Sequence, residues 1–186
     1  MNTTHGKFIA PGEIRFQRLL PGPADRVWSY LVDSEKRSRW LARGELEPRV
    51  GGKIRLEFHN SKLSAAADAP PEKYRTACAD GVGFEGRVLH FDPPRRLAHT
   101  WAEENGSASE VTYELTPQGR EVLLVVTHRR LGEDRDLQVS VGAGWHTHLA
   151  ILAGELAGSA KPSFWAAHTA LEREYEKLIP VTSLRR

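Results

Sequence analysis

The stretch GWHTHLAILAGEL, residues 144–156, decides the fold and also raises the question of function. At about 100° per residue, the turn of an α-helix, its large apolar side chains fall within about 60° of one another and form one stripe: Trp145, Leu149, Leu152 and Leu156. Two histidines, His146 and His148, lie in the same stretch. The segment is therefore a helix that forms either a catalytic or metal-binding cluster or one wall of a pocket.

The spacing of the two histidines argues against a metal site. Histidines that share an ion on one helix stand three or four positions apart, as in HExxH. His146 and His148 stand two positions apart and so point about 160° away from each other around the helix axis. The single cysteine, Cys78, excludes an intramolecular disulfide and a cysteine-based zinc site. Because Walker, GxGxxG and GxSxG motifs are also absent, we expect neither a metal ion nor a cofactor.

The chain before this helix is mainly β-structure. Runs with apolar residues at every second position predict strands at residues 13–20, 50–59, 83–91, 96–102, 109–116 and 121–131. The turn signals DPP (92–94) and TPQG (116–119) leave short connections, which predict an antiparallel meander. Between the first two strands, the sequence predicts two short helices, one that starts near Pro23 and one over 34–40.

A further amphipathic helix is predicted in PSFWAAHTALEREYEKLIP (162–180). Its apolar positions recur at alternating spacings of four and three: Phe164, His168, Leu171, Tyr175 and Leu178. The side of the long helix opposite Trp145 carries mostly small residues, which permit close backbone approach: Thr147, Ile151, Gly154 and Gly158. The additional helix is expected either to dock there or to pair with a second chain, so a homodimer remains open.

These elements predict one α+β domain with a cavity. A curved antiparallel sheet has one face to bury, and the long helix is the only large cover for that face. We expect residues 1–158 to form the domain, and 159–186 to add an amphipathic helix and tail to it. The loop at 60–81 has no clear period and is expected to be either a lid over the cavity or disordered.

Composition and charge limit the partners. The chain has 186 residues, of which 40% are hydrophobic and 27% charged, as is typical of a water-soluble globular protein. Its 26 basic and 24 acidic side chains give a net charge of +2, without the basic stripe of a nucleic-acid-binding protein. The longest aliphatic run, VLLVV (122–126), is too short to span a membrane, and the first residues do not resemble a signal peptide. We expect a cytoplasmic protein with no nucleic-acid partner and no membrane span.

Six segments carry a family resemblance through their shared order: PADRVWSYLVDSEKRSRW, VGGKIRLEF, FEGRVLHFDPPRRLAHTW, SEVTYELTPQG, THRRL and GWHTHLAIL. Taken together, they resemble the SRPBCC superfamily of helix-grip, START-like domains, and within it the branch of heat-shock-protein ATPase activator homologues. The resemblance implies a curved sheet wrapped around the long helix, with two short helices after the first strand. The superfamily includes lipid carriers, aromatic cyclases, hormone receptors and co-chaperone modules. It therefore implies a small-molecule cavity or a chaperone partner in the stress response, and the fold alone does not choose between them.

The candidate pocket is predicted from six residues that face the space between sheet and helix: Trp40, Trp101, Tyr113, His128, Trp145 and Leu149. Aromatic walls with few convergent polar groups are typical of sites for small molecules. We expect an apolar or aromatic ligand, whose polar end His128 and Tyr113 would orient. Three alternatives remain open: a cyclase or hydratase that uses His128 as general base, a co-chaperone-type module that uses the outer surface, and a core that the tryptophans fill completely.

Overall fold

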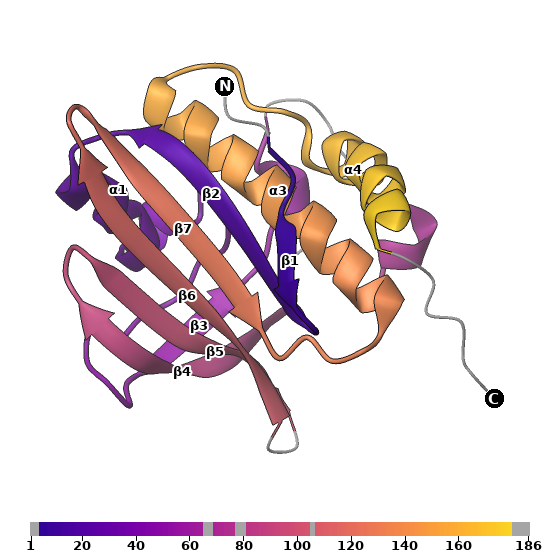
Figure 1. Ribbon diagram of the computed structural model, residues 1–186, viewed down its shortest axis with the longest axis horizontal. Helices are drawn as coiled ribbons and strands as arrows, with labels where there is room; N and C mark the ends of the chain where they lie inside the picture. Colours follow the sequence, from indigo (N-terminus) through magenta and orange to yellow (C-terminus); the bar gives the residue numbers. More distant parts are fainter. Residues whose placement is uncertain (1–3, 65–68, 77–80, 105–106, 180–186) are drawn as a thin grey trace.

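The computed structural model describes residues 4–64, 69–76, 81–104 and 107–179 (Figure 1). A seven-stranded antiparallel sheet, in the order β1-β2-β7-β6-β5-β4-β3, curves around the long helix α3 (Arg135–Ala157). Its strands are β1 (Lys7–Ala10), β2 (Glu13–Pro21), β3 (Lys53–Glu57), β4 (Gly83–Asp92), β5 (Arg96–Glu104), β6 (Ser107–Gln118) and β7 (Glu121–Arg129). Two short helices, α1 (Ala24–Val32) and α2 (Ser34–Arg37), follow β2. The predicted α+β helix-grip fold is confirmed.

Strand β7 is an interior strand of the sheet and pairs with β2 on one side and with β6 on the other. Its inward face is buried along its length, at Val122, Leu124, Val126 and His128. The register places His128 between Ile14 of β2 and Val111 of β6. The period of two along this strand therefore identified the buried face correctly.

Strand β1 was not predicted, because four residues are too few to show a period. It pairs only with the start of β2, from Ala10↔Glu13 to Lys7↔Arg15. The second half of β2, from Arg18 to Pro21, therefore has no strand beside it on that side among the described residues. This free edge borders a groove.

Helix α3 is fixed at both ends by local interactions. The Asp134 side chain accepts hydrogen bonds from the backbone N–H groups of Asp136 and Leu137, which satisfies donors that the first turn leaves unpaired. Gly158 ends the helix with a φ of 63°, a conformation that glycine adopts without strain. Between these caps, the predicted stripe of Trp145, Leu149, Leu152 and Leu156 is buried.

Helix α4 (Phe164–Leu178) lies beside α3 of the same chain (Figure 1). Tyr175 of α4 packs closely on Gly142, which the sequence analysis did not select: a Cβ atom at Gly142 would lie 2.9 Å from the Tyr175 ring. Gly154 instead borders the linker to α4, because a Cβ atom at Gly154 would lie 3.2 Å from the Ala160 carbonyl oxygen. At about 100° per residue, Gly142 is about 60° from Trp145 around the helix axis, so Tyr175 packs outside the face of small residues that the sequence predicted as the docking face.

The loop after β3 carries two single turns of 3₁₀ helix, η1 (Asn60–Lys62) and η2 (Glu72–Tyr74). Tyr74 of η2 is 9% exposed and stacks on Trp165 of α4, with 5.5 Å between the ring centroids. The described part of the loop at 60–81 therefore packs against α4, whereas Cys78 lies outside the described residues. No helix in the described ranges has the length and apolar character that crossing a membrane requires.

Candidate functional site

A cavity of about 240 Å³, hereafter the aromatic pocket, opens where the ends of β3, β4 and β5 meet helices α3 and α4. Its aromatic walls are Phe58, Phe84, Trp101, Phe164 and Trp165, together with the ring of Tyr74. Successive rings touch: the Trp101 centroid lies 5.0 Å from that of Phe84 and 5.8 Å from that of Phe58. Rings at these separations form a continuous apolar surface that suits another ring.

The floor of the aromatic pocket is one side of α3. Val141, Gly144 and His148 stand three and four residues apart and so face the same way. Gly144 has no side chain to fill this space, and a Cβ atom built there would meet nothing within 4 Å. The pocket thus exists partly because a helix interior position, where glycine costs stability, carries glycine.

The polar wall of the aromatic pocket is formed by Tyr74, Ser140 and His168, backed by Glu172. The Tyr74 hydroxyl donates a hydrogen bond to Glu172 and is also hydrogen-bonded to Ser140 Oγ at 3.1 Å. Glu172 is 5% exposed, and its Oε1 accepts from Lys73 Nζ at 2.8 Å. Burial raises the pKa of Tyr74, so its proton stays on the hydroxyl at neutral pH.

Both histidines that line the aromatic pocket are neutral at neutral pH. His148 Nδ1 donates to the Trp40 carbonyl oxygen at 2.7 Å, which leaves Nε2 as the ring's acceptor. Burial lowers the pKa of His148 to about 4. Burial also lowers the pKa of His168, whose Nδ1 lies 3.9 Å from Glu172 Oε2. The pocket therefore offers neutral acceptors and hydroxyl groups, not an exposed charge.

Behind Trp101 lies a chain of buried hydrogen bonds that runs in one direction. Trp145 Nε1 donates to His128 Nδ1 at 3.0 Å, and His128 Nε2 donates to Ser109 Oγ at 2.8 Å. Ser109 then donates to the Trp101 carbonyl oxygen at 3.2 Å. Because Trp145 can only donate, it fixes the tautomer of His128, and burial lowers the pKa of this histidine to about 3. Both ring nitrogens of His128 are occupied, which leaves no free lone pair for a general base.

Of the six residues predicted to line a pocket, Trp101 lines the aromatic pocket. Four of the others are in the core within reach of Trp101 or of one another, and Trp40 is fully buried with its Nε1 bonded to the Tyr30 carbonyl oxygen at 2.9 Å. The Trp101 centroid is 5.2 Å from Trp145 and 5.5 Å from His128, and that of Tyr113 is 5.9 Å from Trp145. Tyr113, Trp145 and Leu149 are each at most 3% exposed, so side chains fill much of the space that the sequence assigned to a ligand.

Sequence reasoning did not select Tyr74, Phe84 and Trp165 for this site. Tyr74 lies in a loop without a period, and only its stacking on Trp165 places it at the pocket. Trp165 follows Phe164 in a helix whose position on α3 the sequence does not reveal. The one available signal in the sequence was the pair of adjacent aromatic residues, Phe164 and Trp165, at the start of the helix. The apolar stripe of that helix includes Phe164 and not Trp165.

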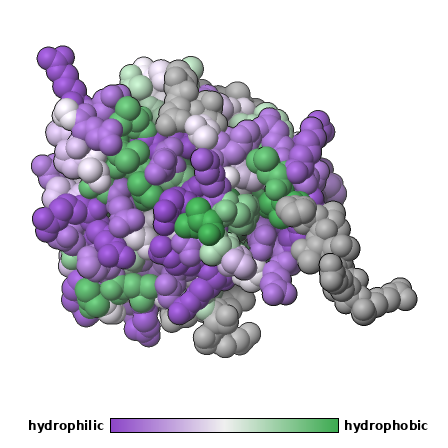
Figure 2. Space-filling model, viewed as in Figure 1, coloured by the Kyte–Doolittle hydropathy of each residue, from purple (hydrophilic) through white to green (hydrophobic). Residues whose placement is uncertain are grey.

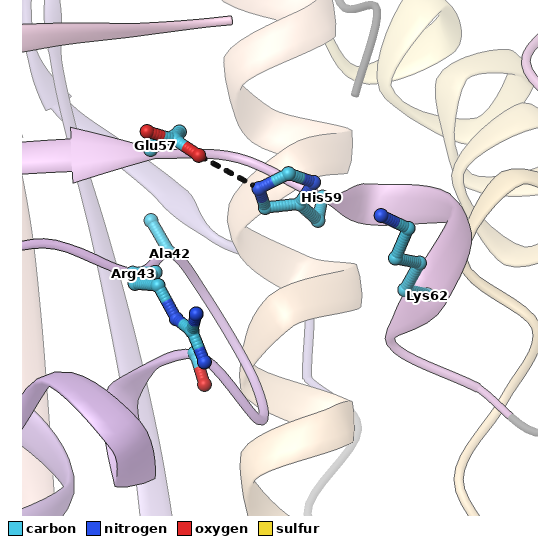
Figure 3. A pocket seen from close by; sticks show the side chains of 6 residues that line it. Ala42, Arg43, Glu57, His59 and Lys62 are labelled. Atoms are coloured by element: carbon cyan, nitrogen blue, oxygen red, sulfur yellow. Dashed lines mark hydrogen bonds and ion pairs between the residues drawn. The ribbon is translucent and has the colours of Figure 1, made fainter. Parts of the chain in front are cut away.

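A second hollow, of about 360 Å³, lies at the surface on the other side of the segment 57–60. Figure 3 shows its charged residues: Glu57 and His59 joined by a hydrogen bond of 2.9 Å, Arg43 across from them, and Lys62 on η1. The bond from His59 lowers the pKa of Glu57, and Arg43 forms an ion pair with Glu35 at 3.0 Å. Because Glu57 and Arg43 already have partners at this exposed surface, where ion pairs contribute little, this hollow is a weaker candidate than the aromatic pocket.

No group of three or more histidine, cysteine, aspartate or glutamate side chains in the described ranges is placed to hold a metal ion. His146 and His148 have separate neighbours, since His146 Nδ1 lies 3.3 Å from the Tyr175 hydroxyl, and His148 bonds to Trp40.

Comparison with known families matches residues 21–157 to the model described as activator of Hsp90 ATPase homolog 1-like protein. No curated protein matches the chain. Among solved structures, it is similar to the Bordetella parapertussis protein encoded by gene BPP1335, with 41% identity and a TM-score of 0.78. That alignment covers 98% of this chain and 94% of the other.

Two more distant structures share the fold. CalU16 from Micromonospora echinospora is 24% identical with a TM-score of 0.62, over 89% of this chain and 87% of the other. The protein CV1439 from Chromobacterium violaceum is 24% identical with a TM-score of 0.59, over 79% of this chain and 98% of the other.

Proposed function

The chain belongs to the family of activator of Hsp90 ATPase homolog 1-like proteins, and on this premise we propose that it binds a small aromatic molecule of one or two rings in the aromatic pocket. The observation that carries the proposal is the open space above Gly144, enclosed by the rings of Trp101, Phe164 and Trp165. An apolar cavity of about 150 Å³ holds a benzene molecule. A volume of about 240 Å³ therefore suits one or two rings and argues against a lipid or a larger ring system.

The polar wall defines where the ligand's polar end would lie. Tyr74 and Ser140 present hydroxyl groups, and His148 presents a neutral acceptor. A phenolic hydroxyl on the ligand would find both donors and acceptors there, and the carboxylate behind that wall, Glu172, is already paired with Lys73. We therefore propose a neutral ligand with one hydroxyl or carbonyl group. Tyr74 lies on η2, so movement of this turn would open and close the pocket.

Binding, and not catalysis by His128, is the function that the buried hydrogen bonds support. A general base needs a free lone pair within reach of the substrate. His128 Nδ1 already accepts from Trp145, and the residue is 1% exposed. The predicted alternative of a cyclase or hydratase that uses this histidine would require Trp145 to move and give up its hydrogen bond.

Surface hydrophobicity bears on the alternative of a co-chaperone-type module. Figure 2 shows one face on which small hydrophobic areas are separated by hydrophilic side chains. The large exposed hydrophobic residues are spread over many elements, among them Ile9, Val50, Val82, Leu137 and Leu178. A partner protein, which the family's description suggests, would bind the outer surface, and its binding would not depend on the aromatic pocket.

Two substitutions at Gly144 test the proposal. Gly144→Leu would fill the pocket, and Gly144→Ala would add the same helix preference with far less bulk. Titration of 2-naphthol, followed by calorimetry and tryptophan fluorescence, is expected to show binding by the wild type and by Gly144→Ala. Gly144→Leu should lose about ten-fold or more in affinity, because the leucine side chain would occupy space that the ligand needs.

Native mass spectrometry of freshly purified protein provides an independent measurement, since a retained molecule would add its mass to the chain. The proposal is wrong if 2-naphthol does not bind the wild type, or if it binds Gly144→Leu as well as Gly144→Ala. A partner protein that still binds Gly144→Leu would instead support the interaction module.

A further inference from the structure

A groove on the other flank of α3, hereafter the Arg18 groove, has a volume of about 360 Å³. It runs between the free edge of β2 and the C-terminal half of α3, and the linker to α4 closes one end. Along α3 its wall is built from small residues on one helix face: Ala150, Ala153, Gly154 and Ala157. Leu19, Pro21 and Pro162 complete the apolar surface.

Arg18 lies at this groove with a buried charge. It shares the inward face of β2 with Phe16 and Leu20, and it is 3% exposed. Its Nη1 donates to the backbone oxygens of Thr4 at 3.0 Å and Gln17 at 2.8 Å. Its Nη2 is buried and has no hydrogen-bond partner in the part of the chain that the structure describes. The same described residues supply no ion pair for Arg18.

A second buried arginine, Arg37, shows how this chain provides hydrogen-bond acceptors for a guanidinium group that has only a structural role. Arg37 is 2% exposed and donates to four backbone carbonyl oxygens, those of Leu31, Val32, Ala42 and Gly44. All its terminal nitrogens have partners, whereas Arg18 has one nitrogen without any. A buried cation without a partner of opposite charge is costly, and its fork geometry matches a carboxylate. The difference between the two arginines therefore points to a missing anion at Arg18.

We propose that the Arg18 groove binds a small organic carboxylate, with its carboxylate on the Arg18 guanidinium and its apolar chain along the small residues of α3. Arg18 lines the groove, and its unpartnered Nη2 is the guanidinium nitrogen that would donate to the carboxylate after a small rearrangement of the side chain. His146 also lines the groove and is hydrogen-bonded to Tyr175, so a polar ring lies beside the anion.

His146 and His148, two residues apart on α3, line different cavities. His146 faces the Arg18 groove, and His148 faces the aromatic pocket, each on its own flank of α3. The site is independent of the proposed aromatic ligand, because none of the residues named for one cavity lines the other. Failure of either proposal leaves the other standing.

The test uses octanoate and two probes that each differ from it in one property. Octan-1-ol has the same chain length but no charge, and acetate has the charge but no apolar chain. With ¹³C-labelled alanine methyl groups, octanoate is expected to shift the signals of Ala150 and Ala153, which line the groove. Both octan-1-ol, which lacks the charge, and acetate, which lacks the apolar chain, should bind about ten-fold or more weakly than octanoate.

Variants then identify the guanidinium as the determinant. Arg18→Gln should lose about ten-fold or more in octanoate affinity, and Arg18→Lys should keep part of it, because lysine retains the charge without the fork. Arg120→Gln, at an exposed arginine in the turn before β7, is the matched control and should bind octanoate as the wild type does. Arg18→Met should remain folded with a raised melting temperature, because it removes the unpaired charge.

Three results would overturn the proposal: octan-1-ol binding as tightly as octanoate, unchanged octanoate affinity in Arg18→Gln, or shifts confined to residues outside the groove. An absence of octanoate binding by the wild type would overturn it as well.

Discussion

At the scale of single residues, the most informative groups are the histidines buried between sheet and helix. His99, His128 and His148 are nearly inaccessible to water, and each holds a hydrogen bond to a fixed neighbour. Burial lowers the pKa of His99 and His148 to about 4 and that of His128 to about 3. Their role is to be neutral hydrogen-bonding parts of the core, and this makes the fold sensitive to acid.

The pH dependence of stability follows from the sign of these shifts. In the unfolded chain a histidine takes up a proton near pH 6.5, whereas the folded protein keeps these three neutral until about pH 4 or below. The stability they contribute is complete above pH 6.5 and is lost as the pH falls from 6.5 toward 4. Each histidine lowers the free energy of unfolding by about 1.4 kcal/mol per pH unit in this window.

Urea denaturation at pH 7.5, 6.0 and 5.0 measures the effect. His128→Gln retains an acceptor for Trp145 and a donor for Ser109 and removes one titrating group, so its stability should fall less steeply with acid than that of the wild type. Equal slopes for the two proteins would contradict the assignment of His128 as a buried neutral group.

At the scale of elements, two glycines two residues apart on α3 have opposite roles. Gly142 lies under the Tyr175 ring of α4, and Gly144 faces the open aromatic pocket. Gly142→Ala would place a methyl group 2.9 Å from that ring, so we expect a loss of about 1–3 kcal/mol in stability as α4 is pushed outward. Gly144→Ala meets nothing within 4 Å and should gain about 0.5–1 kcal/mol through helix preference.

Chemical denaturation of both variants checks this pair, and each serves as the control for the other. Equal changes of stability in the two proteins would show that α4 does not depend on close contact at Gly142.

The elements themselves were largely predictable, and the placement of loop residues was not. Period two along β7 and the leucine stripe on α3 each extend over enough residues to identify the element and its buried face. Strand β1 has four residues and forms through its pairing with β2, which leaves no signal in its own sequence. Tyr74 likewise depends on Trp165, about ninety positions later in the chain, and periodicity carries no information about such a pair.

The sequence indicates which side chains point toward the inside of the sheet, but not which of them border an open pocket. Trp101 and Trp145 both point inward as expected, yet Trp145 is packed against His128 and Tyr113, and Trp101 remains at the pocket. Whether an inward side chain lines a cavity depends on how neighbours from other elements fill the space. The open volume arises from Gly144, a residue that the sequence pattern passes over because it carries no side chain.

At the scale of the whole molecule, α3 separates two cavities of different chemistry. The aromatic pocket lies toward β3 and β4, and the Arg18 groove lies toward the free edge of β2. The sheet order places these strands at opposite ends, since β2 is second and β4 sixth of seven. Because the residues of α3 that face one cavity point away from the other, ligands can occupy both without touching.

Two ligands on separate sites should therefore stabilise the fold additively. A ligand present at 100 times its dissociation constant adds about 2.7 kcal/mol to the free energy of unfolding, and in a protein of this size 1 kcal/mol corresponds to about 2–4 °C in melting temperature. Melting curves with saturating 2-naphthol, saturating octanoate and both together should give a combined shift equal to the sum of the single shifts. In Gly144→Leu the naphthol shift should fall to about half or less and the octanoate shift should remain, whereas Arg18→Gln should show the reverse. A combined shift no larger than the greater single shift would mean that both ligands compete for one cavity. A combined shift that differs from the sum in the wild type would instead mean that α3 couples the two sites, and the affinity of each ligand would then change by the same factor in the presence of the other.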